Sequence, residues 1–241
     1  MQSASYDQIA EWYDEQIRTG RLLHNIVLPA LLTVIGKVQG QQICDLACGQ
    51  GVAARQLAQR GAHIVGIDLS ERLLALAQQE EDAHPLHIVY QLDDAQKGQT
   101  LADASFDGVV CNMALMDIPD LTATFRTVWR ILRSHGWFAF SITPPCLQMP
   151  GSFWVEHHDG IVTRETGNYF AEGFWVQANA TGVKGRVGAH HRIVSTYLNT
   201  LVQAGFQIRA LAEPRAEGVL AEQFPAYREL PAALVVYSMK I

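Results

Sequence analysis

Short apolar runs alternate with helical patterns in the first half of this chain, and this alternation constrains the fold more than any other feature of the sequence. The runs QQICDLAC (41–48) and AHIVGIDL (62–69) are typical of buried parallel strands. The segment RQLAQRG between them is predicted to be a helix that ends at Gly61. Units of this kind predict an α/β protein with a doubly wound sheet and helices on both faces.

The alternation continues on both sides of this unit. Two helices are predicted after it, one over 71–79 that Ser70 caps and one over 121–132 that ends before Gly136. The apolar residues of the second helix share one face: Leu121, Phe125, Val128 and Leu132. The other elements are expected as helices over 6–17 and 22–38 and as strands over 87–92, 106–113 and 137–142.

The pattern changes between Thr143 and Ala189, where glycine and aromatic residues are frequent and the periodicity is lost. Part of this stretch is predicted to form two strands around a turn at TGVKG (181–185), which is a hairpin inserted late in the domain. A helix over 195–205 and strands over 206–211 and 231–239 are expected to follow.

Charge and composition exclude several classes of protein. The formal net charge is −6 and the basic residues are scattered, which argues against a protein that wraps a nucleic-acid backbone. The start of the chain lacks a basic region followed by an apolar core, and the longest apolar stretch is broken by Pro29. We therefore expect a soluble, cytoplasmic protein that binds neither nucleic acid nor membranes. Its four cysteines show no C-x-x-C pattern, which indicates reduced thiols and no zinc site.

A glycine loop, DLACGQG (45–51), follows the first predicted strand and fits any doubly wound nucleotide-binding fold. Asp45, Asp68 and Asp94 stand near the ends of successive strands, where ligands bind in such sheets. Asp68 can accept the ribose hydroxyls of an adenosine. Because Asp45 and Asp94 add negative charge, they favour a ligand such as S-adenosylmethionine, which carries a sulfonium and an ammonium and no phosphate. The alternatives are turn or helix-capping roles for the aspartates and tight packing for the glycines.

Four segments resemble the successive motifs of the class I S-adenosylmethionine-dependent methyltransferases. They are ICDLACGQG, VGIDLSERLLALA, YQLDDAQ and FDGVVCNMALMDIPDL, and the resemblance covers roughly residues 5 to 143. AHHRIVSTYLNTLVQAGFQIRALAEP also resembles the late helix and strand of the small-molecule branch of that family. The resemblance implies a Rossmann-like sheet of seven strands in the order 3-2-1-4-5-7-6, with the seventh and last strand antiparallel.

The length of 241 residues suits one α/β domain, so together with the resemblance it predicts a single methyltransferase domain over residues 1–241. Its parts are a helical cap (1–40), a cofactor-binding core (41–143), a lid or substrate insertion (144–192) and the C-terminal part of the sheet (193–241).

Residues that match the family motifs are implied to bind S-adenosylmethionine. Along the methionine part stand Asp45, Ala47, Gly49 and Gly51, with Asn112 and Met113 at its end; Asp68 meets the ribose; Leu69, Asp94 and Ala95 meet the adenine; and Tyr6 and Tyr13 close over the cofactor.

Methyl transfer needs the acceptor atom in line and about 3 Å from the methyl carbon, and a histidine can take the proton of a hydroxyl acceptor. Two histidine doublets, 157–158 and 190–191, lie in the atypical stretch. His191 is the preferred catalytic candidate because HHR falls where relatives bring a strand toward the active-site mouth. An ordinary surface or hydrogen-bonded histidine is the alternative. No metal is expected at EHHD, since two consecutive residues cannot easily chelate one ion.

The same stretch is rich in aromatic side chains, which suit an apolar or aromatic acceptor under a lid or equally a small core beneath a hairpin. They are Phe153, Trp154, Tyr169, Phe170, Phe174 and Trp175. We therefore expect methyl transfer to an oxygen or nitrogen of a small apolar or aromatic metabolite.

Other functions are weighed against this one. NMAL (112–115) departs from the Asn-Pro-Pro-aromatic pattern of enzymes that methylate amino groups of bases or glutamine. Cys146 in TPPC suggests a cysteine-nucleophile methyltransferase acting on a base, which the acidic charge disfavours. Asp45 and Asp94 disfavour a nicotinamide dehydrogenase. A cofactor-binding module without catalysis stays open, as do the acceptor and the choice between a monomer and a homodimer.

Overall fold

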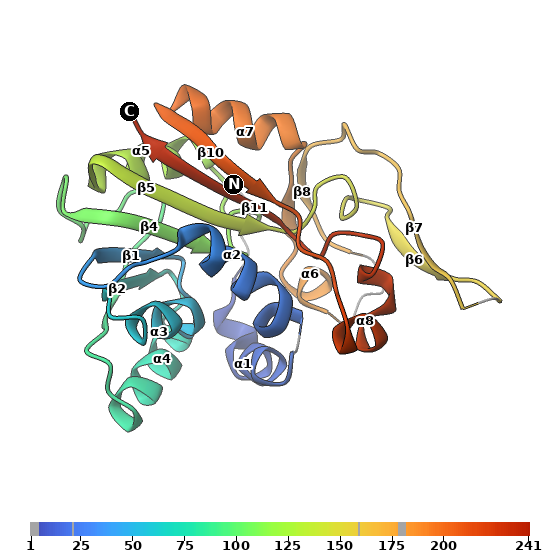
Figure 1. Cartoon of the computed structure of the whole chain (residues 1–241), viewed down its shortest axis with the longest axis horizontal. Coiled ribbons are helices and arrows are strands. Elements are labelled where there is room, and N and C mark those ends of the chain that lie inside the picture. The colour runs from blue at the N-terminus through green and yellow to red at the C-terminus, as the bar shows by residue number, and fades with distance from the viewer. Residues whose placement is uncertain (1–4, 21, 159, 178–181) are drawn as a thin grey trace.

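A seven-stranded sheet forms the centre of the protein in a computed structural model that describes residues 5–20, 22–158, 160–177 and 182–241 (Figure 1). Its strands are β1 (Gln42–Leu46), β2 (His63–Asp68), β3 (Val89–Leu92), β4 (Phe106–Asn112), β5 (Leu132–Ile142), β10 (Phe206–Ala212) and β11 (Leu234–Lys240). Their order is β10-β11-β5-β4-β1-β2-β3, and β11 runs antiparallel to both of its neighbours. Counted within the sheet, this is the order 3-2-1-4-5-7-6 with the last strand antiparallel, so the predicted fold is confirmed.

Helices cover both faces of this sheet. They are α2 (Leu28–Ile35), α3 (Val52–Ala58) and α4 (Glu71–Ala83) on one face, and α5 (Leu121–Ile131) and α7 (Val194–Gln203) on the other. The predicted cap of α4 is confirmed, because Ser70 Oγ accepts a hydrogen bond from the N–H of Leu73 at 3.1 Å.

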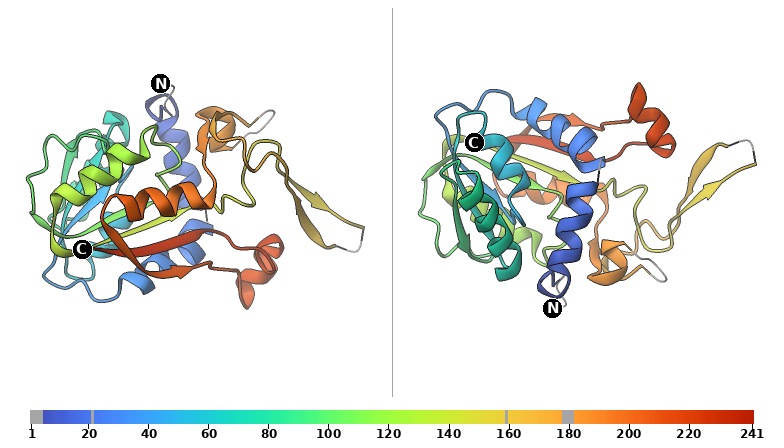
Figure 2. Two further views of the ribbon diagram at one scale, coloured as in Figure 1. Left: turned by 90° about the horizontal axis from the view of Figure 1, so that it is seen from above. Right: turned by 90° about the horizontal axis from the view of Figure 1, so that it is seen from below.

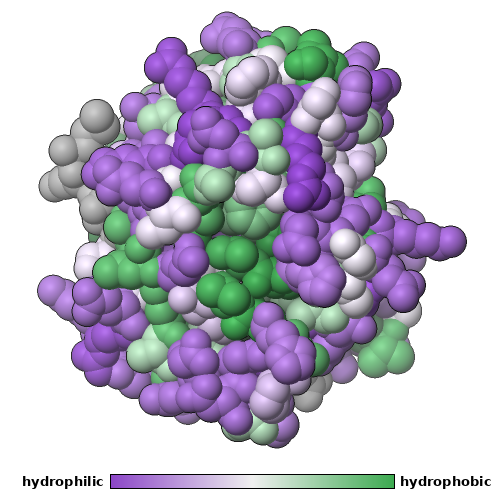
Figure 3. Space-filling view, turned by 90° about the vertical axis from the view of Figure 1, so that its left-hand side faces the viewer, coloured by the Kyte–Doolittle hydropathy of each residue, from purple (hydrophilic) through white to green (hydrophobic). Residues whose placement is uncertain are grey.

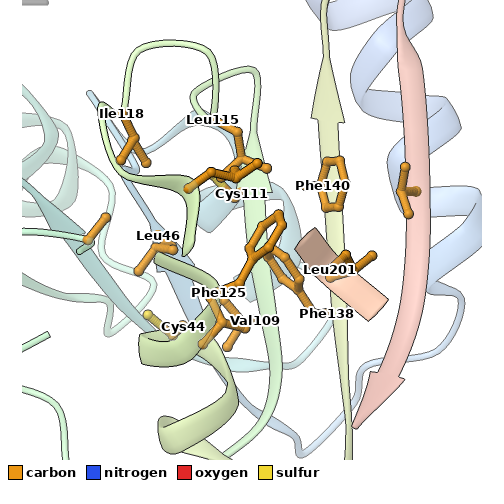
Figure 4. Close-up of a cluster of buried hydrophobic side chains, with 14 of the residues drawn as sticks. Cys44, Leu46, Val109, Cys111, Leu115, Ile118, Phe125, Phe138, Phe140 and Leu201 are labelled. Atoms are coloured by element: carbon orange, nitrogen blue, oxygen red, sulfur yellow. The ribbon is translucent and has the colours of Figure 1, made fainter. Parts of the chain in front are cut away.

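An aromatic cluster fills the space between the sheet and α5 (Figure 4). The ring of Phe125 on α5 lies 5.7 Å from the ring of Phe138 and 6.1 Å from that of Phe140, both on β5. Leu201 of α7 packs into the same cluster. The predicted apolar face of α5 is therefore buried as expected, and it packs this helix firmly against the sheet.

The end of α5 differs from the prediction. The helix ends at Ile131 and β5 begins at Leu132, so Gly136 lies within the strand. The register shifts here, with Leu132 opposite Phe106 and Trp137 opposite Gly108. This irregularity is a bulge on β5 that accommodates the extra residues between Leu132 and Trp137.

The N-terminal region contains two helical segments, as predicted, but they are interrupted. A short 3-10 helix (Asp7–Ile9) precedes α1 (Ala10–Thr19), and a π-helical segment (Leu23–Val27) leads into α2. Gly36, at φ +76°, ends α2 two residues before the predicted boundary.

The late segment, residues 144–192, contains two small antiparallel sheets. The strands β6 (Phe153–Glu156) and β7 (Val162–Glu165) form a hairpin that projects from the body (Figures 1 and 2). The strands β8 (Gly173–Trp175) and β9 (Ala189–His191) pair with each other.

The predicted turn at TGVKG is wrong where the structure describes it. Val183–Arg186 form the short helix α6, while residues 178–181 lie outside the described residues. The strand pair around this segment is present, with Gly173 opposite His191. Hydrogen bonds from the Lys184 side chain to Thr143 and Gln148 connect α6 to the segment that follows β5.

After the late segment the chain forms α7 and β10, followed by α8 (Val219–Gln223), a 3-10 helix (Pro225–Tyr227) and β11. Figure 3 views the end of the molecule opposite the hairpin, where the surface is mainly hydrophilic around a central hydrophobic area. Within the described residues, no helix is both long and apolar enough to span a bilayer.

Candidate functional site

A cavity lies at the carboxyl ends of β1, β2 and β4, beneath the N-terminal helices, and we call it the first cavity. Nine of the twelve residues predicted to bind the cofactor line it: Tyr6, Tyr13, Asp45, Ala47, Gly49, Asp68, Leu69, Asn112 and Met113. Parallel strands bring their carboxyl ends to one edge of the sheet, which explains how residues so distant in sequence meet.

The glycine loop turns sharply at the edge of the first cavity. Ala47, Gly49 and Gly51 all have positive φ, at +57°, +55° and +83°. A Cβ atom on Gly51 would lie 2.2 Å from the hydroxyl of Tyr90, whereas one on Gly49 would meet only Leu73, at 3.9 Å. Gly51 therefore serves packing, as the alternative interpretation held, while Gly49 leaves space on the cavity side.

Asp45 places a carboxyl group at the wall of the first cavity. Only 1% of the residue is exposed, and its Oδ2 accepts a hydrogen bond from the N–H of Ala54 at 2.9 Å. Its Oδ1 has no hydrogen-bond partner among the described residues. Burial raises the pKa of Asp45 to about 7. A cation beside Oδ1 would satisfy this oxygen and favour its ionised form.

Asp68 connects the glycine loop to β2. Its Oδ2 accepts a hydrogen bond from the N–H of Gly49 and its Oδ1 accepts one from the N–H of Ser70, each at 2.8 Å. Each oxygen has a second lone pair, so the carboxylate can also accept hydroxyl donors from a ligand. Burial raises the pKa of Asp68, and these backbone hydrogen bonds oppose that rise. The apolar side chain of Leu69, 61% exposed, stands beside it.

Asp94 and Ala95 do not line the first cavity. Asp94 Oδ1 accepts hydrogen bonds from the N–H of Gln96 at 2.9 Å and from its side-chain amide at 3.0 Å. Its Oδ2 lies 3.4 Å from the Nζ of Lys97. Ala95 packs into the hydrophobic core. The Asp94 carboxyl group therefore stabilises a turn, which is the alternative weighed for it.

Tyr6, Tyr13 and Asp117 close the first cavity. The Tyr6 hydroxyl donates a hydrogen bond to Asp117 Oδ2 at 2.8 Å, and the rings of Tyr6 and Tyr13 lie 4.9 Å apart. Asp7 holds this segment in place, since its Oδ1 accepts a hydrogen bond from the Ser70 hydroxyl at 2.6 Å. The N-terminal segment is thus hydrogen-bonded both to the end of β2 and to the loop after β4.

Sequence reasoning did not select Asp117, although it lies within the NMALMDIPDL motif after β4. Burial raises the pKa of Asp117 to about 7, while the hydrogen bond from Tyr6 and the charge of Lys184 oppose the rise. A carboxyl group with such a pKa takes and gives protons near neutral pH.

Asn112 and Met113 form the floor where β4 ends. Asn112 Oδ1 accepts a hydrogen bond from the Ser141 hydroxyl at 2.7 Å, and the N–H of Met113 donates to the carbonyl of Ser141 at 2.9 Å. Met113 has a φ of +56°, a conformation that these hydrogen bonds hold in place.

His191 lies outside the first cavity. It is 3% exposed, and its Nε2–H donates a hydrogen bond to the carbonyl of Tyr169 at 2.7 Å. It lines a second, smaller cavity between β9, α6 and the end of β5. The structure does not bring His191 to the residues around the first cavity.

The second cavity includes residues from both sides of the late segment: Met116, Thr143, Pro145, Gln148, Trp175, Lys184, Ala189, His190, His191, Arg192 and Tyr197. Met116 lines this cavity while its neighbour Asp117 lines the first one. The two cavities are thus separated by the loop after β4.

Of the six aromatic residues selected from the sequence, Trp175 lines the second cavity. Trp154 instead packs against the ring of Tyr227 at 5.5 Å and beneath the guanidinium of Arg164 at 4.7 Å. Phe170 is 83% exposed. The aromatic residues of this stretch therefore divide between two roles: some pack within or against the β6–β7 hairpin, and Trp175 lines the second cavity.

The remaining sequence candidates lie away from these cavities. His157 bonds through Nε2 to the hydroxyl of Thr163 at 2.8 Å, within the β6–β7 hairpin. Cys146 is exposed and lines neither cavity. No group of three or more potential metal ligands is found within the described residues.

Comparisons with known proteins agree with this arrangement. Residues 44–140 match the family model described as Methyltransferase domain. An S-adenosylmethionine-dependent methyltransferase structure from Mesorhizobium loti is 32% identical, with a TM-score of 0.75 over 88% of this chain and 96% of that chain. A putative S-adenosylmethionine-dependent methyltransferase from Listeria monocytogenes is 26% identical, with a TM-score of 0.73 over 88% and 97%. The chain therefore belongs to the class I S-adenosylmethionine-dependent methyltransferases, and its cofactor is S-adenosylmethionine.

Curated relatives are similar over a shorter region. The ubiquinone biosynthesis O-methyltransferase of Bordetella avium is 26% identical over 134 residues, which are 55% of this chain and 56% of that protein. The chain thus spans just over half the length of this relative.

The residues of the first cavity fit the cofactor of the family. The unpartnered Oδ1 of Asp45 suits the ammonium group, the free lone pairs of Asp68 suit the ribose hydroxyls, and Gly49 leaves room beside them.

Proposed function

We propose that this enzyme methylates an oxygen atom of a small acceptor molecule, which reaches the first cavity past the loop after β4. The observation that carries this proposal is the position of Asp117. Its carboxyl group lines the first cavity beside Met113 and Ile118 and receives a hydrogen bond from Tyr6. A hydroxyl acceptor must lose its proton, and a carboxylate at this point can accept it.

The chain's own residues would hold the cofactor from three sides. Asp45 would bind the ammonium group, Asp68 the ribose hydroxyls, and Leu69 the adenine ring. Tyr6 and Tyr13 would cover the cofactor and exclude water. S-adenosylmethionine supplies the methyl group when it is bound.

Asp117 is proposed as the general base in place of His191. Because the pKa of Asp117 is raised to about 7, a substantial fraction of this carboxyl group is ionised at neutral pH. The hydrogen bond from Tyr6 to Oδ2 fixes the orientation of the carboxyl group and so the direction in which Oδ1 points. His191 uses Nε2 in a hydrogen bond to the carbonyl of Tyr169 and lines the other cavity. The proposal that His191 is the base has no comparable contact in its favour.

Oxygen is proposed as the accepting atom for two reasons. A carboxylate base suits a hydroxyl group with a proton to remove, and relatives such as the Bordetella avium protein are named O-methyltransferases. The acceptor is proposed to be small and apolar or aromatic, because Trp175 and Met116 offer apolar surface beside the entry. The late segment, residues 144–192, would act as the lid that selects it.

A metabolite screen with methyl-labelled S-adenosylmethionine tests the proposal. The library contains phenols and alcohols, each matched with the corresponding amine, and products are identified by mass spectrometry. We expect O-methylated products. Labelling confined to amines would overturn the choice of oxygen, and cofactor binding without any labelled product would favour a binding module without catalysis.

A further inference from the structure

Lys184 on α6 lines the second cavity, and the side chains that accept hydrogen bonds from its ammonium group are both neutral. Its ammonium donates hydrogen bonds to Gln148 Oε1 at 2.8 Å and to Thr143 Oγ1 at 3.2 Å. It also lies 5.8 Å from the centre of the Trp175 ring. Among the residues that the structure describes, no carboxylate forms an ion pair with this ammonium. A partly buried positive charge is thus held by groups that cannot neutralise it.

The charged groups nearby do not pair with the positive charge of the Lys184 ammonium. Asp117 is the carboxylate that acts most strongly on Lys184, but its side chain lines the first cavity and accepts a hydrogen bond from Tyr6. Arg164 adds a positive charge, which opposes ionisation of Lys184. Burial lowers the pKa of Lys184 to about 8, so its ammonium form still predominates at neutral pH.

The other cation of the second cavity is already satisfied. Arg192 donates hydrogen bonds to the carbonyls of Leu115 at 3.1 Å, Ile118 at 2.6 Å and Pro119 at 2.8 Å. These bonds hold the loop that carries Asp117. Arg192 therefore stabilises the conformation of the loop after β4. Lys184, in contrast, donates hydrogen bonds to two side-chain oxygens at the wall of the second cavity.

We propose that Lys184 binds a carboxylate group of the methyl acceptor, so that the preferred acceptors are small hydroxy acids whose remaining surface is apolar or aromatic. This inference rests on the proposed function, because the acceptor must extend from Asp117 in the first cavity, past the loop after β4, to Lys184 in the second cavity. The carboxylate would lie at Lys184 with Thr143 and Gln148 beside it, and the hydroxyl would face Asp117. The same lysine would reject neutral analogues, since they leave its charge unpaired.

Binding of simple acids tests the proposal without knowledge of the acceptor. Formate, acetate and benzoate are each compared with the matching neutral amide by NMR titration of the protein loaded with S-adenosylhomocysteine. At least one acid should bind about tenfold or more tightly than its amide, because a charge-assisted hydrogen bond is gained. Lys184→Met should abolish this preference, and Lys37→Met, which changes an exposed lysine outside both cavities, should preserve it.

Three results overturn the proposal: no acid binds better than its amide, the preference persists in Lys184→Met, or Lys37→Met loses it equally. If the protein does not bind S-adenosylhomocysteine at all, the proposed function fails first. If it binds this product while the acids show no preference, only the role of Lys184 fails.

A pH titration covers the case in which Lys184→Met does not fold. The groups that face the ammonium are Asp117, Arg164, His190, His191, Arg192 and Tyr197. Acid binding should fall by about tenfold as the pH rises from 7 to 9.5, because Lys184 loses its proton, and amide binding should stay constant. Asp117 ionises at the lower end of this range, so the titration is repeated in Asp117→Asn. The fall should remain in this variant and move to a lower pH, because the Asp117 carboxylate raises the pKa of Lys184. A flat profile there overturns the proposal.

Discussion

The edge of the sheet around the first cavity and the late segment beside it hold their functional groups in different ways. At the first cavity, backbone N–H groups of Gly49 and Ser70 bind the carboxylate of Asp68. In the late segment, side chains make the connections: Lys184 reaches Thr143 and Gln148 across the chain. The contacts of Asp68 depend on the course of the backbone, and the contacts of Lys184 depend on which side chains are present.

We propose that this difference separates two tasks of the enzyme. A site built on backbone geometry is tolerant of sequence change and suits a cofactor that all members of the family share. A site built from long side chains changes with each substitution and suits the choice of acceptor. Variants in the two regions should therefore affect different kinetic constants.

The largest expected effect concerns the loop that separates the two cavities. Asp117→Asn keeps a hydrogen-bond acceptor for Tyr6 but removes the proposed base, so kcat should fall about 10²-fold or more with cofactor affinity unchanged. His191→Ala is the matched variant for the base favoured by the sequence. Steady-state kinetics with the acceptor from the screen compares the two, and a greater loss in His191→Ala would return the role of base to that histidine.

A second prediction concerns the connection between the glycine loop and β2. Asp68→Ala should weaken S-adenosylmethionine binding by roughly 1.5–3 kcal/mol, because hydrogen bonds to a charged acceptor are lost. Asp94→Ala is the control, since that carboxyl group binds its own turn and lies outside the first cavity. Isothermal titration measures both, and equal losses would place Asp94 at the cofactor after all.

The pH dependence of cofactor binding tests Asp45. Burial raises the pKa of Asp45 to about 7, so the group is mostly neutral at pH 6 and mostly ionised at pH 8. The ionised form attracts an ammonium group, and affinity should therefore increase by about tenfold from pH 6 to pH 8. Asp45→Asn should remove most of this increase. An affinity that decreases with pH in the wild-type protein would contradict the assignment.

Two tryptophans of the late segment should differ in their effect on the acceptor. Trp175→Ala should raise KM for the acceptor by about tenfold while cofactor affinity stays within a few-fold, because Trp175 lines the second cavity. Trp154→Ala should change KM less, since Trp154 packs against Arg164 and Tyr227. If Trp175→Ala instead weakens cofactor binding, the two regions are not separate in function.

Local sequence patterns predicted part of the first cavity, and the resemblance to the family supplied the other residues. The glycine loop, the cap at Ser70 and the position of Asp68 depend on backbone geometry within a few residues, and these are the features that composition and spacing reveal. The strand order followed from the resemblance of those same segments to a family. Asp94 shows the limit of this reasoning, because the same position after a strand suits a ligand contact or a turn, and its side chain forms the turn.

Tertiary structure decided which polar side chains meet where we propose that the acceptor binds. Tyr6 and Asp117 are 111 residues apart and meet because the N-terminal segment crosses the end of β4. Lys184 and Thr143 are 41 residues apart and meet because α6 folds back to the edge of the sheet. Periodicity in the chain reports which face of an element is buried, and it carries no information about which polar side chains meet across distant elements. The sequence by itself therefore determined the fold and most of the residues that line the first cavity, and the packing of distant segments decided which polar side chains meet beside it.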